Sequence, residues 1–214
     1  MIGSSAPARR RDYGRLVMIP VAFLLLLFDA IAVTQRAGGN AAPWPVAILT
    51  FAFYGLLIWC YLRRGPAVAT SGSITGYAAA AVAIPLSFAV PLFRGAAPTA
   101  GPGYVADALI LAGGAWGVWS LRSLGRSMSI IAQARQVVDR GPYRWIRHPL
   151  YAGEIVSSLG LAITAGTAVA YGGWLAFCGL QAYRAVREEQ VLLSALSGYR
   201  SYRARTAALL PGFL

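Results

Sequence analysis

Residues 141–153 read GPYRWIRHPLYAG and hold the only histidine of the chain, His148, together with two prolines and two arginines. Pro149 suits the first position of a helix, because its missing N–H costs nothing there and its φ is already helical. His148 then caps that helix beside free backbone N–H groups and the positive end of the helix dipole, which attracts anions. The stretch therefore indicates either a cofactor pocket where cytosol meets a bilayer, or a basic turn that anchors a helix to lipid headgroups.

The composition around this stretch is that of a membrane protein. The 214 residues are 57% hydrophobic and only 12% charged, and the mean hydropathy is +0.58, far from the values of soluble domains. Cys60 and Cys178 lie in apolar segments and are expected to be small buried hydrophobic residues. With one histidine and two distant cysteines, no metal site is expected.

Four apolar segments before the stretch are long enough to span a bilayer. They are residues 16–34, 44–62, 74–93 and 104–121. A signal peptide is the alternative for the first segment, because Ala30-Ile31-Ala32 resembles a cleavage site. In the fourth, Gly113, Gly114 and Gly117 would allow close contact with another helix.

The chain beyond the stretch predicts a helical hairpin. Residues 152–183 are too long for one ordinary span, and Gly166 or Gly172-Gly173 could form the turn. The last helix should continue past the bilayer over residues 184–196, where charges return. The predicted fold is an all-α, polytopic membrane bundle of about six spans with a cytosolic cofactor pocket. Its parts are a mobile tail (1–15), four transmembrane helices (16–121) and a core of connector, motif, hairpin, post-membrane helix and tail (122–214).

The arginines predict the orientation of this bundle. All 19 basic residues are arginine, and six spans would place seventeen of them on the side of the N-terminus. Only Arg36 and Arg94 would lie on the other side. Because basic loops remain cytosolic, the termini and the active site should face the cytosol. The net charge of +12 then reflects topology and the lipid bilayer as partner, and no nucleic acid is needed to explain it.

Two adjacent acids, Glu188 and Glu189, follow the hairpin. Neighbouring residues on a helix do not share a face, so only one of the two should point into a site. Arg184 lies four residues before Glu188, and a salt-bridged helix end is the simpler alternative to a catalytic role.

Several of these stretches together resemble the isoprenylcysteine carboxyl methyltransferases, and the membrane phospholipid methyltransferases share much of the pattern. The matching residues are Ser123-Leu124-Gly125-Arg126-Ser127, residues 141–144, Arg147-His148-Pro149-x-Tyr151-x-Gly153 and Glu188-Glu189. The resemblance covers about residues 120–211. One departure is the segment Leu196-Ser197-Gly198-Tyr199, which lacks the acidic residue that the family shows before this tyrosine.

The resemblance implies an integral membrane methyltransferase that uses S-adenosyl-L-methionine and acts on an amphiphilic acceptor. Carboxyl O-methylation of the isoprenylcysteine type is the expected reaction, and phospholipid N-methylation is the alternative. The implied cofactor-binding residues are Tyr143, His148, Pro149, Leu150, Tyr151, Gly153, Glu188 and Glu189. The implied catalytic residues are Arg147, Arg184, Glu188 and Glu189.

The chemistry of methyl transfer agrees with these residue types. The aromatic rings of Tyr143, Trp145 and Tyr151 could solvate a sulfonium cation through their π faces. A carboxylate acceptor needs no general base, whereas an amine must be neutral to attack and a glutamate could take its proton. A transporter would need polar residues deep in several spans, where Asp29 is the main candidate, and a non-catalytic membrane scaffold is a further alternative.

Overall fold

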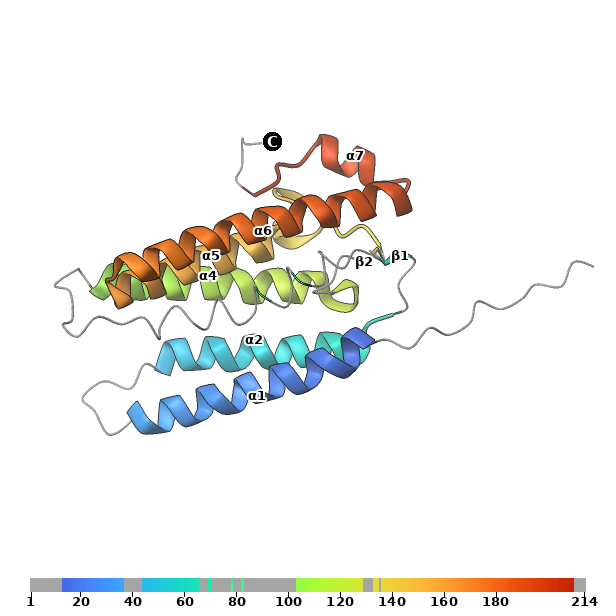
Figure 1. Ribbon diagram of the computed structural model, residues 1–214. Coiled ribbons are helices and arrows are strands. Elements are labelled where there is room, and N and C mark those ends of the chain that lie inside the picture. Colours follow the sequence, from blue (N-terminus) through green and yellow to red (C-terminus); the bar gives the residue numbers. More distant parts are fainter. Residues whose placement is uncertain are drawn as a thin grey trace, which may run out of the picture.

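The computed structural model describes residues 13–36, 44–65, 69–70, 78, 82, 103–128, 133–134 and 136–209. Five long helices lie roughly along one direction, and a short sixth helix lies against the end of the last long one (Figure 1). Their contacts follow the order α1 on α2, α2 on α4, α4 on α5 and α5 on α6. The helices are α1 (Tyr13–Arg36), α2 (Trp44–Arg63), α4 (Gly103–Leu124), α5 (Pro149–Ala165), α6 (Ala168–Ala195) and α7 (Tyr199–Ala204).

Three of the four predicted N-terminal spans coincide with helices. Helix α1 contains the first and begins at Tyr13, so residues 13–15 are helical and do not belong to a tail as predicted. Helices α2 and α4 match the second and fourth within a few residues. The third, residues 74–93, lies outside the described residues except for positions 78 and 82. Within the described part of the chain, two helices are long and apolar enough to cross a membrane, Trp44–Arg63 and Gly103–Ser127.

The predicted hairpin is present, and its turn lies at Gly166. Helix α5 ends there because Gly166 adopts a left-handed φ of 66°, and its N–H bonds to the carbonyl of Ala162 at 2.9 Å. Thr167 then caps α6 by accepting a hydrogen bond from the N–H of Ala170. Helix α5 begins at Pro149, earlier than residue 152. The second predicted turn site, Gly172-Gly173, is inside α6.

Helices α4 and α5 touch through glycines. A Cβ atom on Gly153 would lie 2.8 Å from the carbonyl oxygen of Gly113 and 3.0 Å from the amide nitrogen of Gly117. The predicted packing role of Gly113 and Gly117 is therefore confirmed. Gly153 shares that role, because the side of α5 on which it lies is filled by the backbone of α4.

A hydrophobic core joins α1, α2 and α4 to the first turn of α5. It includes Tyr61, Leu121 and Leu150. Cys60 is fully buried in this core, as predicted, whereas Cys178 on α6 is only partly buried. No group of three potential metal-binding side chains occurs among the residues that the structure describes.

One end of the bundle gathers the segments that the sequence placed on a single side. The guanidinium of Arg15 donates to the carbonyl of Arg64, and that of Arg126 donates to the carbonyl of Arg63, both at 3.1 Å. The start of α1 and the ends of α2 and α4 therefore meet. The start of α5, the end of α6 and α7 lie at the same end (Figure 1). A short antiparallel pair of strands, β1 (Ala69–Thr70) and β2 (Gln133–Ala134), also lies there.

Candidate active site

The segment before α5 has the local structure that its prolines and histidine predict. Residues Gly141–Arg144 form a short 3-10 helix, and the N–H of Trp145 bonds to the carbonyl of Pro142. His148 is the N-cap of α5, and Pro149 is its first residue. The side chain of His148 makes no capping hydrogen bond, so the imidazole remains available for contacts with other parts of the chain.

The tail after α7 closes over this segment by backbone pairing. The N–H of Arg147 donates to the carbonyl of Ala207 at 2.8 Å, and the N–H of His148 donates to that of Ala208 at 3.0 Å. In return, the N–H of Ala207 donates to the carbonyl of Trp145 at 3.3 Å. The polypeptide that carries the motif is therefore fixed at its backbone before any side chain contributes.

The imidazole of His148 lies between the two glutamates of α6. Its Nε2 is 3.2 Å from Oε1 of Glu189, and its Nδ1 is 3.8 Å from Oε2 of Glu188. The ring also stacks on Tyr151, with centroids 5.5 Å apart and planes 2° from parallel. The expectation that only one glutamate would face the site is therefore wrong. The two side chains diverge by about 100° around α6, and a ring placed between these directions is reached by both.

Arg147 is buried and holds the end of α6 against the tail. Its Nε donates to Oε1 of Glu189 at 2.7 Å, and its Nη1 donates to the carbonyls of Arg203, at 3.1 Å, and of Thr206. Its side chain is only 4% exposed. These contacts give Arg147 a structural role, in place of a guanidinium directed only at an acceptor.

Glu189 is ionised at neutral pH because of these neighbours. Burial alone would raise the pKa of its carboxyl. The hydrogen bonds from His148 and Arg147, together with their charges, outweigh burial and lower this pKa to about 2. Arg203 contributes a further contact, with its Nε 3.2 Å from Oε2 of Glu189.

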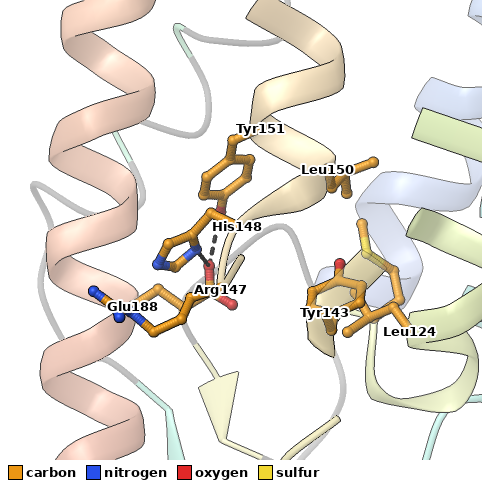
Figure 2. Close-up of a pocket in the computed structure, with 8 residues that line it drawn as sticks. Leu124, Tyr143, Arg147, His148, Leu150, Tyr151 and Glu188 are labelled. Atoms are coloured by element: carbon orange, nitrogen blue, oxygen red, sulfur yellow. Dashed lines mark hydrogen bonds and ion pairs between the residues drawn. The ribbon is translucent and has the colours of Figure 1, made fainter. Parts of the chain in front are cut away.

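A pocket with an empty volume of about 310 Å³ opens beside His148. Figure 2 shows Leu124 and Tyr143 on one side of it, and Arg147, His148 and Glu188 on the other. Oε2 of Glu188 accepts a hydrogen bond from the hydroxyl of Tyr151 at 2.9 Å, which fixes this carboxylate in the wall. The complete lining is Leu124, Met128, Tyr143, Arg147, His148, Leu150, Tyr151 and Glu188.

The structure places the remaining predicted site residues around this pocket, outside its lining. Pro149 is buried at the start of α5, Gly153 faces α4, and Glu189 contacts His148. The guanidinium carbon of Arg184 lies 4.8 Å from the centre of the Tyr151 ring.

Trp145 does not line the pocket, although the sequence suggested a role for it beside a cation. Its indole stacks on Trp116, with centroids 6.4 Å apart, and lies edge-on to Trp119. The guanidinium of Arg144 covers it at 4.6 Å. Within the pocket lining, Tyr143 and Tyr151 are therefore the aromatic rings.

Sequence reasoning did not assign Leu124 or Met128 to the pocket, and it made no tail contact. Leu124 belongs to the Ser-Leu-Gly-Arg-Ser stretch of the family pattern, and Met128 follows it directly. In the tail, the hydroxyl of Tyr202 donates to the carbonyl of Tyr143 at 2.7 Å. The tail thus reaches the motif even though the chain lacks the acidic residue of the family before Tyr199.

Residues 103–196 match the family model described as phospholipid methyltransferase. The match runs from the start of α4 to just past α6, so it contains all the residues that line the pocket. Residues 103–196 are a phospholipid methyltransferase family domain. This family includes the isoprenylcysteine carboxyl methyltransferases, so the resemblance seen in the sequence is confirmed. Membership implies a membrane methyltransferase. The comparison with curated proteins gave no match.

Proposed function

We propose that the protein is a multi-pass membrane methyltransferase that takes its methyl group from S-adenosyl-L-methionine. The proposed reaction is carboxyl O-methylation of an amphiphilic acceptor of the isoprenylcysteine type. The observation that carries the proposal is the packing of His148 between Glu188 and Glu189 at the wall of a pocket inside the family domain.

The side chains of the pocket fit this cofactor in their chemistry. When bound, S-adenosyl-L-methionine supplies an electrophilic methyl group on a sulfonium cation. Glu188 offers a carboxylate that can accept hydrogen bonds from an ammonium or from hydroxyl groups. Tyr143 and Tyr151 offer π faces to a cation, while Leu124 and Leu150 offer apolar surface to a purine ring.

The residues that hold the walls also keep the pocket in shape for transfer. Tyr151 fixes the carboxylate of Glu188, and His148 is fixed by its stacking on Tyr151 and by Glu189. Prearranged walls of this kind can orient two reactants, which alone can supply several kcal/mol of rate enhancement. They also exclude water from the reacting charges.

Apolar outer faces support a position of the bundle within a bilayer. Leu24 on α1, Ile48 on α2 and Leu175 on α6 each expose at least 62% of their surface. Such surfaces are typical of helices that face lipid. Among the described arginines, all but Arg36 belong to segments at the end of the bundle that carries the pocket. By the positive-inside rule, this end is proposed to face the cytosol.

Charges near the pocket favour an acidic acceptor. Arg184 lies over the ring of Tyr151 and brings a permanent positive charge beside the pocket wall. A carboxylate attacks without a general base. Phospholipid N-methylation is the second candidate, since the carboxylate of Glu188 lies within the pocket and could take a proton from an amine.

Calorimetry on purified protein in detergent tests the cofactor site. We expect S-adenosylhomocysteine to bind, and His148→Ala to weaken the affinity at least tenfold, because the imidazole holds both glutamates in place. Gly172→Ala is the matched control, since Gly172 lies in α6 with no atom near its would-be Cβ, and it should bind normally. A folded sample that does not bind S-adenosylhomocysteine contradicts the enzyme proposal. Methyl transfer to a farnesylated cysteine, compared with transfer to phosphatidylethanolamine, then separates the two reactions.

A further inference from the structure

Gln181 joins a carboxylate on α5 to a guanidinium on α6. Its side chain is fully buried, its Nε2 donates to Oε2 of Glu154, and its Oε1 accepts from Nη1 of Arg184 at 2.6 Å. A carboxylate only accepts hydrogen bonds and a guanidinium only donates them, so the orientation of the amide is fixed by its two partners. The amide is a neutral bridge between two opposite charges.

This bridge lies one helical turn from the pocket. Glu154 follows the pocket residue Leu150 by four positions on α5, and Arg184 precedes Glu188 by four positions on α6. The guanidinium of Arg184 lies over the ring of Tyr151, whose hydroxyl holds Glu188. The polar chain thus starts at the pocket wall and continues into the bundle, away from the arginine-rich end.

Polar side chains at this depth need a reason beyond packing. In an apolar helical bundle, a carboxylate and an amide are costly to bury, and a leucine would fill the same space without that cost. Glu154 and Gln181 also lie outside the sequence pattern by which the family was recognised.

The neutral amide keeps the two charges apart. A direct contact between Glu154 and Arg184 would fix the guanidinium, but it would also place an anion on it. With Gln181 between them, Arg184 is fixed by a hydrogen bond from a neutral group, while the balancing carboxylate stays one side chain away. Because the attraction between charges falls with distance, Arg184 is left better able to attract another anion.

We propose that Glu154 and Gln181 are positioning residues that hold Arg184 as the anchor for an acidic head group, on the bilayer side of the pocket. The identity of that ligand as the methyl acceptor rests on the proposed function. The acidic group would lie on Arg184 and its apolar tail along the lipid-facing surface of the bundle. The enzyme would then select amphiphiles with a carboxylate over their neutral or amine analogues.

A swap of the two side chains separates this role from simple packing. In the double variant E154Q/Q181E, residues 154 and 181 can still share an amide–carboxylate hydrogen bond, and the net charge is unchanged. The carboxylate, however, now lies directly on Arg184. We expect the thermal unfolding temperature and the affinity for S-adenosylhomocysteine to stay close to those of the unmodified protein. A role limited to packing predicts that ligand selectivity is also restored.

Selectivity is measured as the ratio of affinities for a farnesylated cysteine with a free carboxylate and for its carboxamide, in detergent and without cofactor. The unmodified protein should prefer the acid at least tenfold, and the swap should reduce the ratio to about one. Gln190→Glu is the matched control, because Gln190 also accepts a hydrogen bond from an arginine, Arg187, at 2.9 Å, but on the exposed side of α6. It should leave the ratio unchanged.

The remaining outcomes are decisive in the same assay. A swap variant that keeps the acid preference overturns the proposal, and so does an unmodified protein that binds acid and amide equally. If the swap variant does not fold, Arg184→Gln should bring the ratio to about one, and a retained preference again overturns the proposal. Because the ratio is read without cofactor, failure of S-adenosylhomocysteine binding would count against the proposed function alone.

Discussion

Nε2 of His148 lies 3.2 Å from Oε1 of Glu189, and this contact joins the residue before α5 to the second half of α6. The same carboxylate oxygen accepts the Nε–H of Arg147 at 2.7 Å. One buried glutamate therefore holds two consecutive residues of the motif. Both walls of the pocket depend on this single point of attachment between the two helices.

The first prediction concerns acid stability. Glu189 has a pKa of about 2 in the folded protein, against 4.5 for an unperturbed glutamate. A lowered pKa means that its contribution to stability is complete above pH 4.5 and is lost as the pH falls toward 2. Glu189→Gln should lower the unfolding temperature at pH 7 and flatten its decline in acid, as thermal unfolding in detergent can show. Removing one partner of a buried ion pair typically costs about 3–5 kcal/mol.

Asp139→Asn is the control for this effect. Asp139 also pairs with an arginine, Arg205, at 3.3 Å, but both side chains are more than half exposed. An exposed pair contributes little to stability, so this variant should follow the unmodified protein across the pH range. Parallel acid curves for Glu189→Gln and the unmodified protein would contradict the assigned role of Glu189.

The second prediction concerns the contact between α4 and α5. Gly153→Ala would place a Cβ 2.8 Å from the carbonyl oxygen of Gly113, and a rigid backbone must move to admit it. We expect a loss of roughly 1–3 kcal/mol in unfolding free energy, typical of overpacking. Gly172→Ala has no atom within 4 Å of the new methyl and should be neutral or slightly stabilising. Equal stability of the two variants would show that the helices are not in close contact.

The third prediction concerns the tail. Tyr202→Phe removes the hydrogen bond from its hydroxyl to the carbonyl of Tyr143, a buried contact of 2.7 Å. The loss should cost about 1 kcal/mol and loosen the tail, so that trypsin cuts faster after Arg203 and Arg205. Tyr171→Phe changes an exposed residue of α6 in the same way and should not alter the cleavage rate. Unchanged cleavage in Tyr202→Phe would mean that other contacts alone hold the tail.

The fourth prediction concerns topology. With Cys60 and Cys178 replaced by alanine, single cysteines in place of Arg122 and Arg200 should react with an impermeant thiol reagent from the cytosolic side. Both positions are exposed, at the end of α4 and in α7. A cysteine at Thr167, in the turn between α5 and α6, should react only from the opposite side. Labelling of positions 122 and 200 from different sides would refute the proposed orientation.

Local chemistry explains what the sequence could predict. Pro149 starts α5 and Gly166 ends it, because the φ of proline and the left-handed φ of glycine act within one turn of the chain. The burial of Arg147 and the approach of both glutamates to His148 depend on partners 41 to 59 residues away. A helical period gives the direction of a side chain around its own axis, but it does not say what stands in that direction.

The backbone pairing of the tail with the motif also sets an order of events during synthesis. Since chains grow from the N-terminus, α5 and α6 are complete before Ala207 and Ala208 exist to bond to Arg147 and His148. A ribosome stalled at the end of α6 would thus carry a finished hairpin with a site still open at its backbone. Maturation of the pocket is consequently a late step, which follows insertion of the hairpin and depends on the segment after α7 reaching back to the start of α5.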